Sequence, residues 1–101
     1  MNVKKIGDMK ELKKLALALR ALGLDAKVVS DPVYYGGKIF CENTFAIIKR
    51  GECVWKVWKE DGRPFEVHFY AGKSCVYDCI LYSSLFEVVQ RISFDCARNG
   101  E

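Results

Sequence analysis

Residues 52–70 read ECVWKVWKEDGRPFEVHFY and carry the strongest fold signal in the chain. Residues 52–59 and residues 64–70 are rich in Val, Trp, Phe and Tyr, and each run divides its side chains between two faces, as β-strands do. Asp61-Gly62 lies between the runs and supports the positive backbone angles of a tight turn. Pro64 is acceptable because it begins the second run. The stretch therefore predicts an antiparallel hairpin.

The two faces of this hairpin differ in composition. One face is apolar and is predicted to join the core; it carries Trp55, Val57, Phe65, Val67 and Phe69. The other face combines an exposed tryptophan with tyrosine, lysine and histidine, which is the composition of a protein-binding hot spot. The predicted partner-binding residues are Val54, Lys56, Trp58, Arg63, Glu66, His68 and Tyr70. The alternative is that another segment, such as the one holding Tyr34 and Tyr35, covers this face.

The segments just before the hairpin predict one further strand. Residues 44–49 read as that strand, and Arg50-Gly51 supplies the turn into the hairpin. Residues 27–30 suit only a short extended piece, because Asp31-Pro32 is expected to break it. Residues 33–37 contain two glycines and read as a loop.

The first element of the chain is predicted to be a helix over residues 9–22. Asp8 can cap it, and Glu11 follows three residues later, in a variant of the capping box. Gly23 can adopt the left-handed conformation that ends a helix. The apolar stripe of this helix consists of Leu12, Leu15, Leu19 and Leu22.

The region after the hairpin has two interpretations. In the favoured one, Ser74 caps a single long helix whose apolar positions are Tyr77, Leu81, Leu85, Val88 and Ile92. In the other, residues 75–82 form a fourth strand, and Ser84 and Glu87 make the capping box of a shorter helix. The predicted fold is a single α+β domain over residues 1–101. It has an N-terminal helix, a three-stranded and possibly four-stranded antiparallel meander, and a C-terminal helix, with both helices on one sheet face.

Composition favours a protein of the reducing cytoplasm. Half of the 101 residues are hydrophobic, which is enough for one core. Five cysteines are an odd number and make a poor disulfide framework, so we expect free thiols. No apolar run has the length of a membrane span, and no signal peptide is expected. The net charge of +3 is small for a dedicated nucleic-acid binder.

The chemistry-bearing residues do not form a recognisable catalytic set. His68 is the only histidine, and no local signature pairs it with a cysteine; it is expected to be a solvated strand residue. Cys75 and Cys79, with His68 and one more ligand, could hold a metal, but their spacing is not that of paired zinc knuckles. Gly72-Lys73-Ser74 lacks the earlier glycine of a phosphate loop. We therefore predict no enzyme activity, no cofactor and no metal.

Several stretches resemble small bacterial immunity proteins of polymorphic toxin systems. Together they span about half of the chain, and they are Tyr34-Tyr35-Gly36-Gly37, Phe45-Ala46-Ile47-Ile48, Val54-Trp55-Lys56-Val57-Trp58, Glu60-Asp61-Gly62-Arg63 and Tyr77-Asp78-Cys79-Ile80-Leu81. The chain departs from that pattern where Ser74-Cys75-Val76-Tyr77 stands in place of an acidic first helical turn. The resemblance implies a protein that occupies a cognate toxin domain and blocks it, which needs no catalytic residues.

The leading hypothesis is therefore a non-enzymatic, protein-binding inhibitor of the immunity kind. A phage-encoded inhibitor of a host defence protein would have the same composition. A small module for single-stranded nucleic acid is the less favoured alternative: Lys49, Arg50, Lys56 and Arg63 would contact phosphates while aromatic side chains stack on bases. Homodimerisation through the exposed aromatic face is compatible with each hypothesis.

Overall fold

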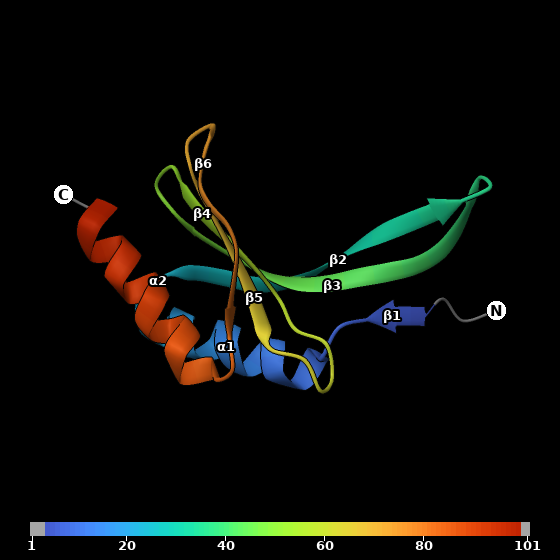
Figure 1. Ribbon diagram of the computed structural model, residues 1–101, viewed down its shortest axis with the longest axis horizontal. Coiled ribbons are helices and arrows are strands. Elements are labelled where there is room, and N and C mark those ends of the chain that lie inside the picture. The colour runs from blue at the N-terminus through green and yellow to red at the C-terminus, as the bar shows by residue number, and fades with distance from the viewer. Residues whose placement is uncertain (1–3, 100–101) are drawn as a thin grey trace.

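The computed structural model describes residues 4–99, and its two helices and six-stranded mixed sheet form an α+β fold (Figure 1). The α+β class is as predicted. The prediction of a three- or four-stranded, purely antiparallel meander is wrong. In chain order, the elements are β1 (Lys4–Ile6), α1 (Met9–Ala21), β2 (Asp25–Tyr35), β3 (Lys38–Arg50), β4 (Cys53–Trp58), β5 (Phe65–Ala71), β6 (Ser74–Tyr82) and α2 (Leu85–Asn99).

The long strand β3 organises the sheet. Along one edge it pairs antiparallel with β2 over almost its full length. Along the other edge its last six residues, 45–50, pair antiparallel with β4, and residues 41–43 pair in parallel with β1. The parallel strand β1 was missed because three residues are too few to show an alternating period.

Strand β2 runs through the expected break at Asp31-Pro32. Pro32 lies opposite Glu42 within the β2–β3 ladder. Proline is tolerated there because β2 pairs only with β3, so the missing N–H falls on an edge strand. The turn comes later, at Gly36 and Gly37, whose φ angles of 59° and 79° suit a tight hairpin. Tyr34 and Tyr35 therefore belong to a strand, not to a loop.

The favoured single long helix after the hairpin is also wrong. Residues 74–82 form strand β6 on the free edge of β5, and α2 begins only at Leu85. The capping box of the alternative interpretation is present: the Glu87 N–H donates to Ser84 Oγ at 3.2 Å, and the Ser84 N–H donates to Glu87 Oε2 at 3.2 Å. The dense apolar run at residues 74–82 fits the period of a helix as well as that of a strand. It forms a strand because the edge of β5 offers unpaired backbone groups.

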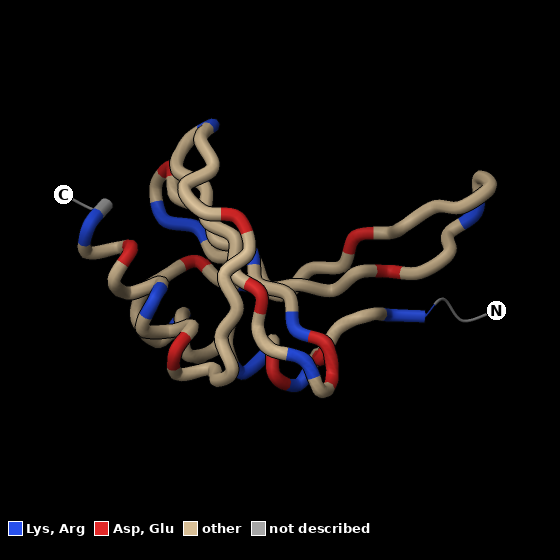
Figure 2. The backbone as a smooth tube through the Cα atoms, viewed as in Figure 1, with Lys and Arg blue, Asp and Glu red and all other residues tan. Residues whose placement is uncertain are grey.

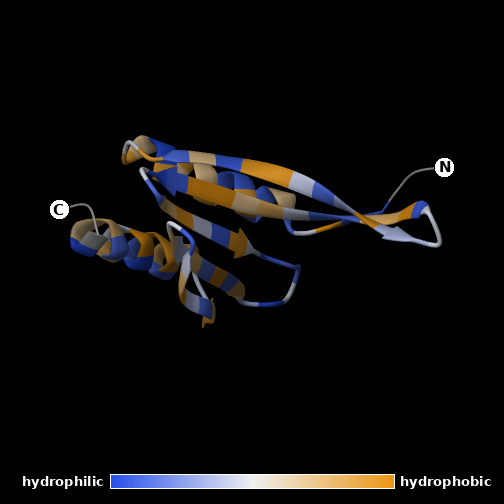
Figure 3. Ribbon diagram, turned by 90° about the horizontal axis from the view of Figure 1, so that it is seen from above, coloured by the Kyte–Doolittle hydropathy of each residue, from blue (hydrophilic) through white to orange (hydrophobic). Residues whose placement is uncertain are grey.

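The helix α1 follows its prediction closely. The Glu11 N–H donates to the Asp8 side chain at 3.2 Å, and Gly23 adopts a φ of 89° after the helix ends. Its leucine stripe enters the core, except that Leu22 is 59% exposed. The stripe and one face of α2 pack on the apolar face of the sheet, so both helices lie on the predicted side (Figures 1 and 3). The fully buried large side chains here include Leu12, Leu15, Leu19, Trp55, Val57, Val67, Phe69, Val88 and Ile92.

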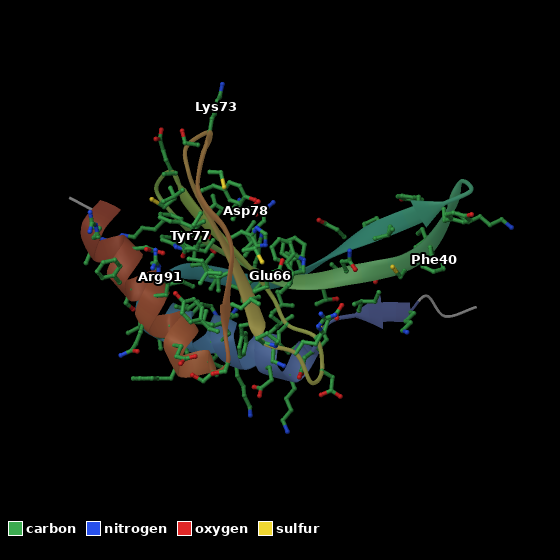
Figure 4. The ribbon with its side chains drawn as sticks, in the orientation of Figure 1. Phe40, Glu66, Lys73, Tyr77, Asp78 and Arg91 are labelled. Carbon is green, nitrogen blue, oxygen red and sulfur yellow. The ribbon has the colours of Figure 1, made fainter. Side chains whose placement is uncertain are left out.

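A buried carboxylate joins α2 to the sheet. Asp95 accepts hydrogen bonds from the Trp55 indole at 2.9 Å and from the Tyr77 hydroxyl at 2.6 Å. The Arg91 guanidinium lies 3.2 Å from the second oxygen of Asp95 and 4.5 Å from the centre of the Tyr77 ring. Figure 4 shows Tyr77 and Arg91 meeting between β6 and α2. Loss of hydration, followed by the bond to Asp95, raises the pKa of Tyr77 well above its usual range.

The β2–β3 hairpin extends beyond the helices as an arm, which contributes to a molecular length of 47 Å against a thickness of 21 Å (Figure 1). Among the described residues, neither helix has the length and apolar character required to cross a lipid bilayer.

Candidate functional site

Six of the seven predicted partner-binding residues lie together on the outer face of β4 and β5. They form three directly opposed pairs, which are Val54 with Tyr70, Lys56 with His68, and Trp58 with Glu66. All six are half-buried. The seventh, Arg63, lies in the exposed β4–β5 connection, 3.7 Å from Glu60.

The aromatic side chains of this face cover one another. Trp58 stacks on Phe45 with ring centres 5.0 Å apart and meets the His68 ring edge-on at 4.8 Å. The Lys56 ammonium lies 5.9 Å from the Phe45 ring and 5.8 Å from the Tyr70 ring. Tyr34 and Tyr35, which were considered as a cover for this face, are instead 63% and 81% exposed on the arm.

His68 is held between two carboxylates, which differs from the solvated residue that was expected. Its Nε2 lies 2.7 Å from Glu66 Oε2, and its Nδ1 lies 2.7 Å from Asp78 Oδ1. Only 14% of the His68 side chain is exposed. Sequence reasoning missed the role of Asp78, because the favoured interpretation placed it in a helix. The alternative strand interpretation places Asp78 in a strand but gives no register that brings it beside His68.

A β-bulge in β6 brings Asp78 and Cys79 to the same histidine. Val67 pairs with Ile80 and Phe69 pairs with Tyr77, so two residues of β6 stand opposite His68. Cys79 has a φ of 69°, and no other described residue except glycine has a positive φ. Such a conformation costs about 1–3 kcal/mol and is found most often at functional sites. One ligand atom each from Glu66, His68 and Cys79 lies within 4.8 Å of the other two.

The thiol of Cys79 is kept in its protonated form. Loss of hydration raises its pKa, and the negative charges of Glu66 and then Asp78 raise it further. Loss of hydration also raises the pKa of Cys53, and the nearby Cys96 and Asp95 raise it further. A nucleophilic cysteine needs the opposite shift, so neither thiol has the environment of an activated nucleophile.

An open pocket of about 390 Å³ lies beside this cluster. Glu66, Cys79 and Trp58 line part of it, and the rest is lined by the β1–α1 junction, the β4–β5 connection, Asn43 and Thr44 of β3, and Leu81 of β6. The backbone at Gly7 packs so closely on β3 that a Cβ atom there would lie 2.8 Å from the Thr44 carbonyl oxygen. Gly7 is therefore required to bring β1 into the sheet and to close this side of the pocket.

The arm forms a second exposed surface that sequence reasoning did not single out. The exposed fractions of Tyr34, Tyr35, Ile39 and Phe40 are 63%, 81%, 44% and 69%. The Tyr35 and Phe40 rings lie 6.3 Å apart, and Figure 4 shows Phe40 near the end of the hairpin. Few charged residues interrupt the arm (Figure 2). The sequence contains these aromatic residues, but the loop predicted at residues 33–37 did not place them on one long hairpin.

No protein-family model, curated protein or solved structure gave a match to this chain.

Proposed function

We propose that this protein is a non-enzymatic inhibitor that binds a protein partner through the β2–β3 arm. The observation that carries the proposal is the set of large apolar side chains exposed on one extended hairpin: Tyr34, Tyr35, Ile39 and Phe40. Aromatic residues bury a large area at low conformational cost, and they dominate the binding energy of protein interfaces. A hairpin that projects from the body can also enter a concave surface of a partner.

Charge on the arm favours a protein over a nucleic acid. Between Asp31 and Asn43 the arm carries two acidic residues, Asp31 and Glu42, and one basic residue, Lys38. Binding to a phosphate backbone requires clustered basic residues and is strongly weakened by salt. An apolar, nearly neutral arm suits a desolvated protein interface.

The mode of contact follows from the edge strand. An exposed edge strand can add a strand from a partner. In β2, however, Pro32 removes one N–H donor from the middle of the edge, which interrupts a continuous ladder. We therefore expect side-chain docking of the aromatic residues to supply most of the affinity.

The finer form of the proposal is an immunity protein that occludes a cognate toxin domain. Its support is the resemblance of the quoted stretches to such proteins together with the projecting arm. The same geometry would serve a phage-encoded inhibitor of a host defence protein, and the identity of the partner distinguishes the two.

The test compares capture of partners by three tagged proteins: the native chain, the double variant Tyr35→Ala/Phe40→Ala, and Leu17→Ala. Leu17 is 64% exposed on α1, away from the arm, and serves as the matched control. The expected result is one stoichiometric protein that the native chain and the Leu17 variant retain and that the arm variant loses. Equal recovery by all three would overturn the arm as the binding surface.

A second experiment tests inhibition itself. The captured partner is expressed alone and together with each of the three proteins, and cell growth is followed. Growth arrest that the native chain relieves, and that the arm variant does not, supports the inhibitor proposal. A partner that is harmless when expressed alone contradicts the toxin form of it.

A further inference from the structure

We propose that Glu66, His68 and Cys79 form a binding site for a divalent transition metal of the zinc type. The three side chains come from β5 and from the bulge of β6, and their ligand atoms lie within 4.8 Å of one another. Figure 4 shows Glu66 on β5 and Asp78 on the edge strand β6, both far from Phe40 on the arm. The site is therefore separate from the surface proposed for partner binding.

The donor atoms select the class of metal. Metal binding would release the thiol proton of Cys79 to solvent. The resulting thiolate sulfur, an imidazole nitrogen and a carboxylate oxygen together match the ligands of zinc. Magnesium and calcium prefer oxygen ligands only, so the sulfur and nitrogen donors argue against them. Three protein ligands leave one position of a tetrahedral ion open, as in zinc sites that bind a further ligand.

The present distances allow a metal with small side-chain movements. His68 Nε2 and Glu66 Oε2 are 2.7 Å apart, which is a hydrogen-bond distance. Two ligands of a tetrahedral zinc ion stand about 3.3 Å apart for nitrogen and oxygen, and about 3.6 Å apart for nitrogen and sulfur. The ion would thus replace the shared proton and widen the first contact by about 0.6 Å. Glu66 and Cys79 are partly exposed, so both can rotate to accommodate it.

Asp78 prepares His68 for this role. Once a metal replaces the Glu66 contact at Nε2, the 2.7 Å contact between Nδ1 and Asp78 Oδ1 would hold the tautomer that donates from Nδ1. The edge-on contact with Trp58 holds the ring plane. A carboxylate behind a histidine ligand is the usual second partner in zinc sites.

Charge at the cluster also favours a cation. Two carboxylates, Glu66 and Asp78, surround one histidine, and no lysine or arginine forms a described ion pair with either of them. The bulge that brings Cys79 into reach carries a strained backbone, which ordinary strand pairing with β5 would not need. The pocket beside Glu66 and Cys79 gives the open coordination position access to a small ligand.

The first test is a Co²⁺ titration of the full-length, reduced protein after treatment with a chelator. Co²⁺ substitutes for zinc, and a bound thiolate produces a charge-transfer band in the near ultraviolet. The native chain and Cys75→Ser should show this band at one equivalent, and Cys79→Ser should lose it. Cys75 is the matched control because it is also exposed and lies on the same strand. Zn²⁺ should displace the cobalt and abolish the band.

Two results would overturn the site. One is a native chain that shows no thiolate–cobalt band, and the other is a band that persists in Cys79→Ser. Because Cys79 is exposed, that variant is expected to fold, and its circular dichroism melt verifies this. The arm variant Tyr35→Ala/Phe40→Ala should keep the band, so failure of the metal site and failure of the proposed function are distinguishable.

The second test concerns Asp78 as a positioning residue. Asp78→Ala should keep the thiolate–cobalt band, because all three ligands remain. Its affinity for Zn²⁺, measured by competition with a chelating indicator, should fall by about 10- to 100-fold. Asp78 is largely exposed, so the substitution should not disturb folding. Unchanged affinity would show that Asp78 does not position the ligand.

Discussion

Trp55 and Trp58 are separated by two residues in the same strand, yet they lie on opposite faces of the sheet. Trp55 is fully buried, stacks on Phe69 at 4.7 Å and donates its indole N–H to Asp95. Trp58 is half-buried and packs between Phe45 and His68. The inner face is therefore organised by the core and one buried carboxylate, whereas the outer face is organised by aromatic and charged side chains that cover each other.

The largest expected effect is that of Trp55→Ala. Truncation of a buried aromatic residue should lower the free energy of unfolding by about 3–5 kcal/mol, because it removes apolar contacts and leaves a cavity. Denaturant-induced unfolding at equilibrium measures this loss. A smaller loss than that of Trp58→Ala would mean that the roles of the two faces are reversed.

The next effect is that of Asp95→Ala. The substitution leaves the Trp55 indole N–H and the Tyr77 hydroxyl without their common acceptor and separates Arg91 from its carboxylate. We expect the free energy of unfolding to fall by about 3 kcal/mol, because the buried polar groups that remain lose their hydrogen-bond partner. Ser93→Ala, at an exposed position of the same helix, is the control and should change stability little. Equal stability of the two variants would show that the carboxylate does not hold α2 to the sheet.

Trp58→Ala should have a smaller effect on stability. The side chain is half-buried, so we expect a loss of roughly 1–2 kcal/mol from its contacts with Phe45 and His68. Thermal and denaturant unfolding should agree on this value. A loss as large as that of Trp55→Ala would place Trp58 in the core and argue against an accessible outer face.

The smallest effect concerns the pH dependence of stability. The folded protein keeps the proton of Tyr77 at a pH where the unfolded chain has lost it, because the pKa of Tyr77 is raised in the fold. The stabilisation is therefore complete below the ordinary tyrosine pKa of about 10, and it declines as the pH rises above that value. The free energy of unfolding of the native chain should fall more steeply above this pH than that of Tyr77→Phe. Parallel curves would contradict the proposed role of the Asp95 bond.

The outer face shows how far sequence reasoning could reach toward the candidate site. Alternation along β4 and β5 correctly placed Trp58, Glu66 and His68 on one face, since a strand directs alternate side chains to opposite sides. It could not place Asp78 and Cys79 beside them. Their position depends on a bulge, which arises from the pairing of β6 with β5 and has no signature in the local sequence.

The arm shows a second limit. The sequence contains the aromatic residues and the two glycines of the turn, but Pro32 argued against a strand. Whether proline is tolerated depends on whether the strand lies at an edge, and only the arrangement of the whole sheet decides that.

Local sequence signals account for the α1 helix with its caps, the β4–β5 hairpin and the side chains that enter the core. These features depend on periods and turns within a few residues, where local backbone preference and burial agree. The parallel pairing of β1, the choice of a strand for residues 74–82 and the meeting of Glu66, His68 and Cys79 arise only in the assembled sheet. Each of these depends on hydrogen bonds and space offered by a strand elsewhere in the chain, which no local pattern encodes.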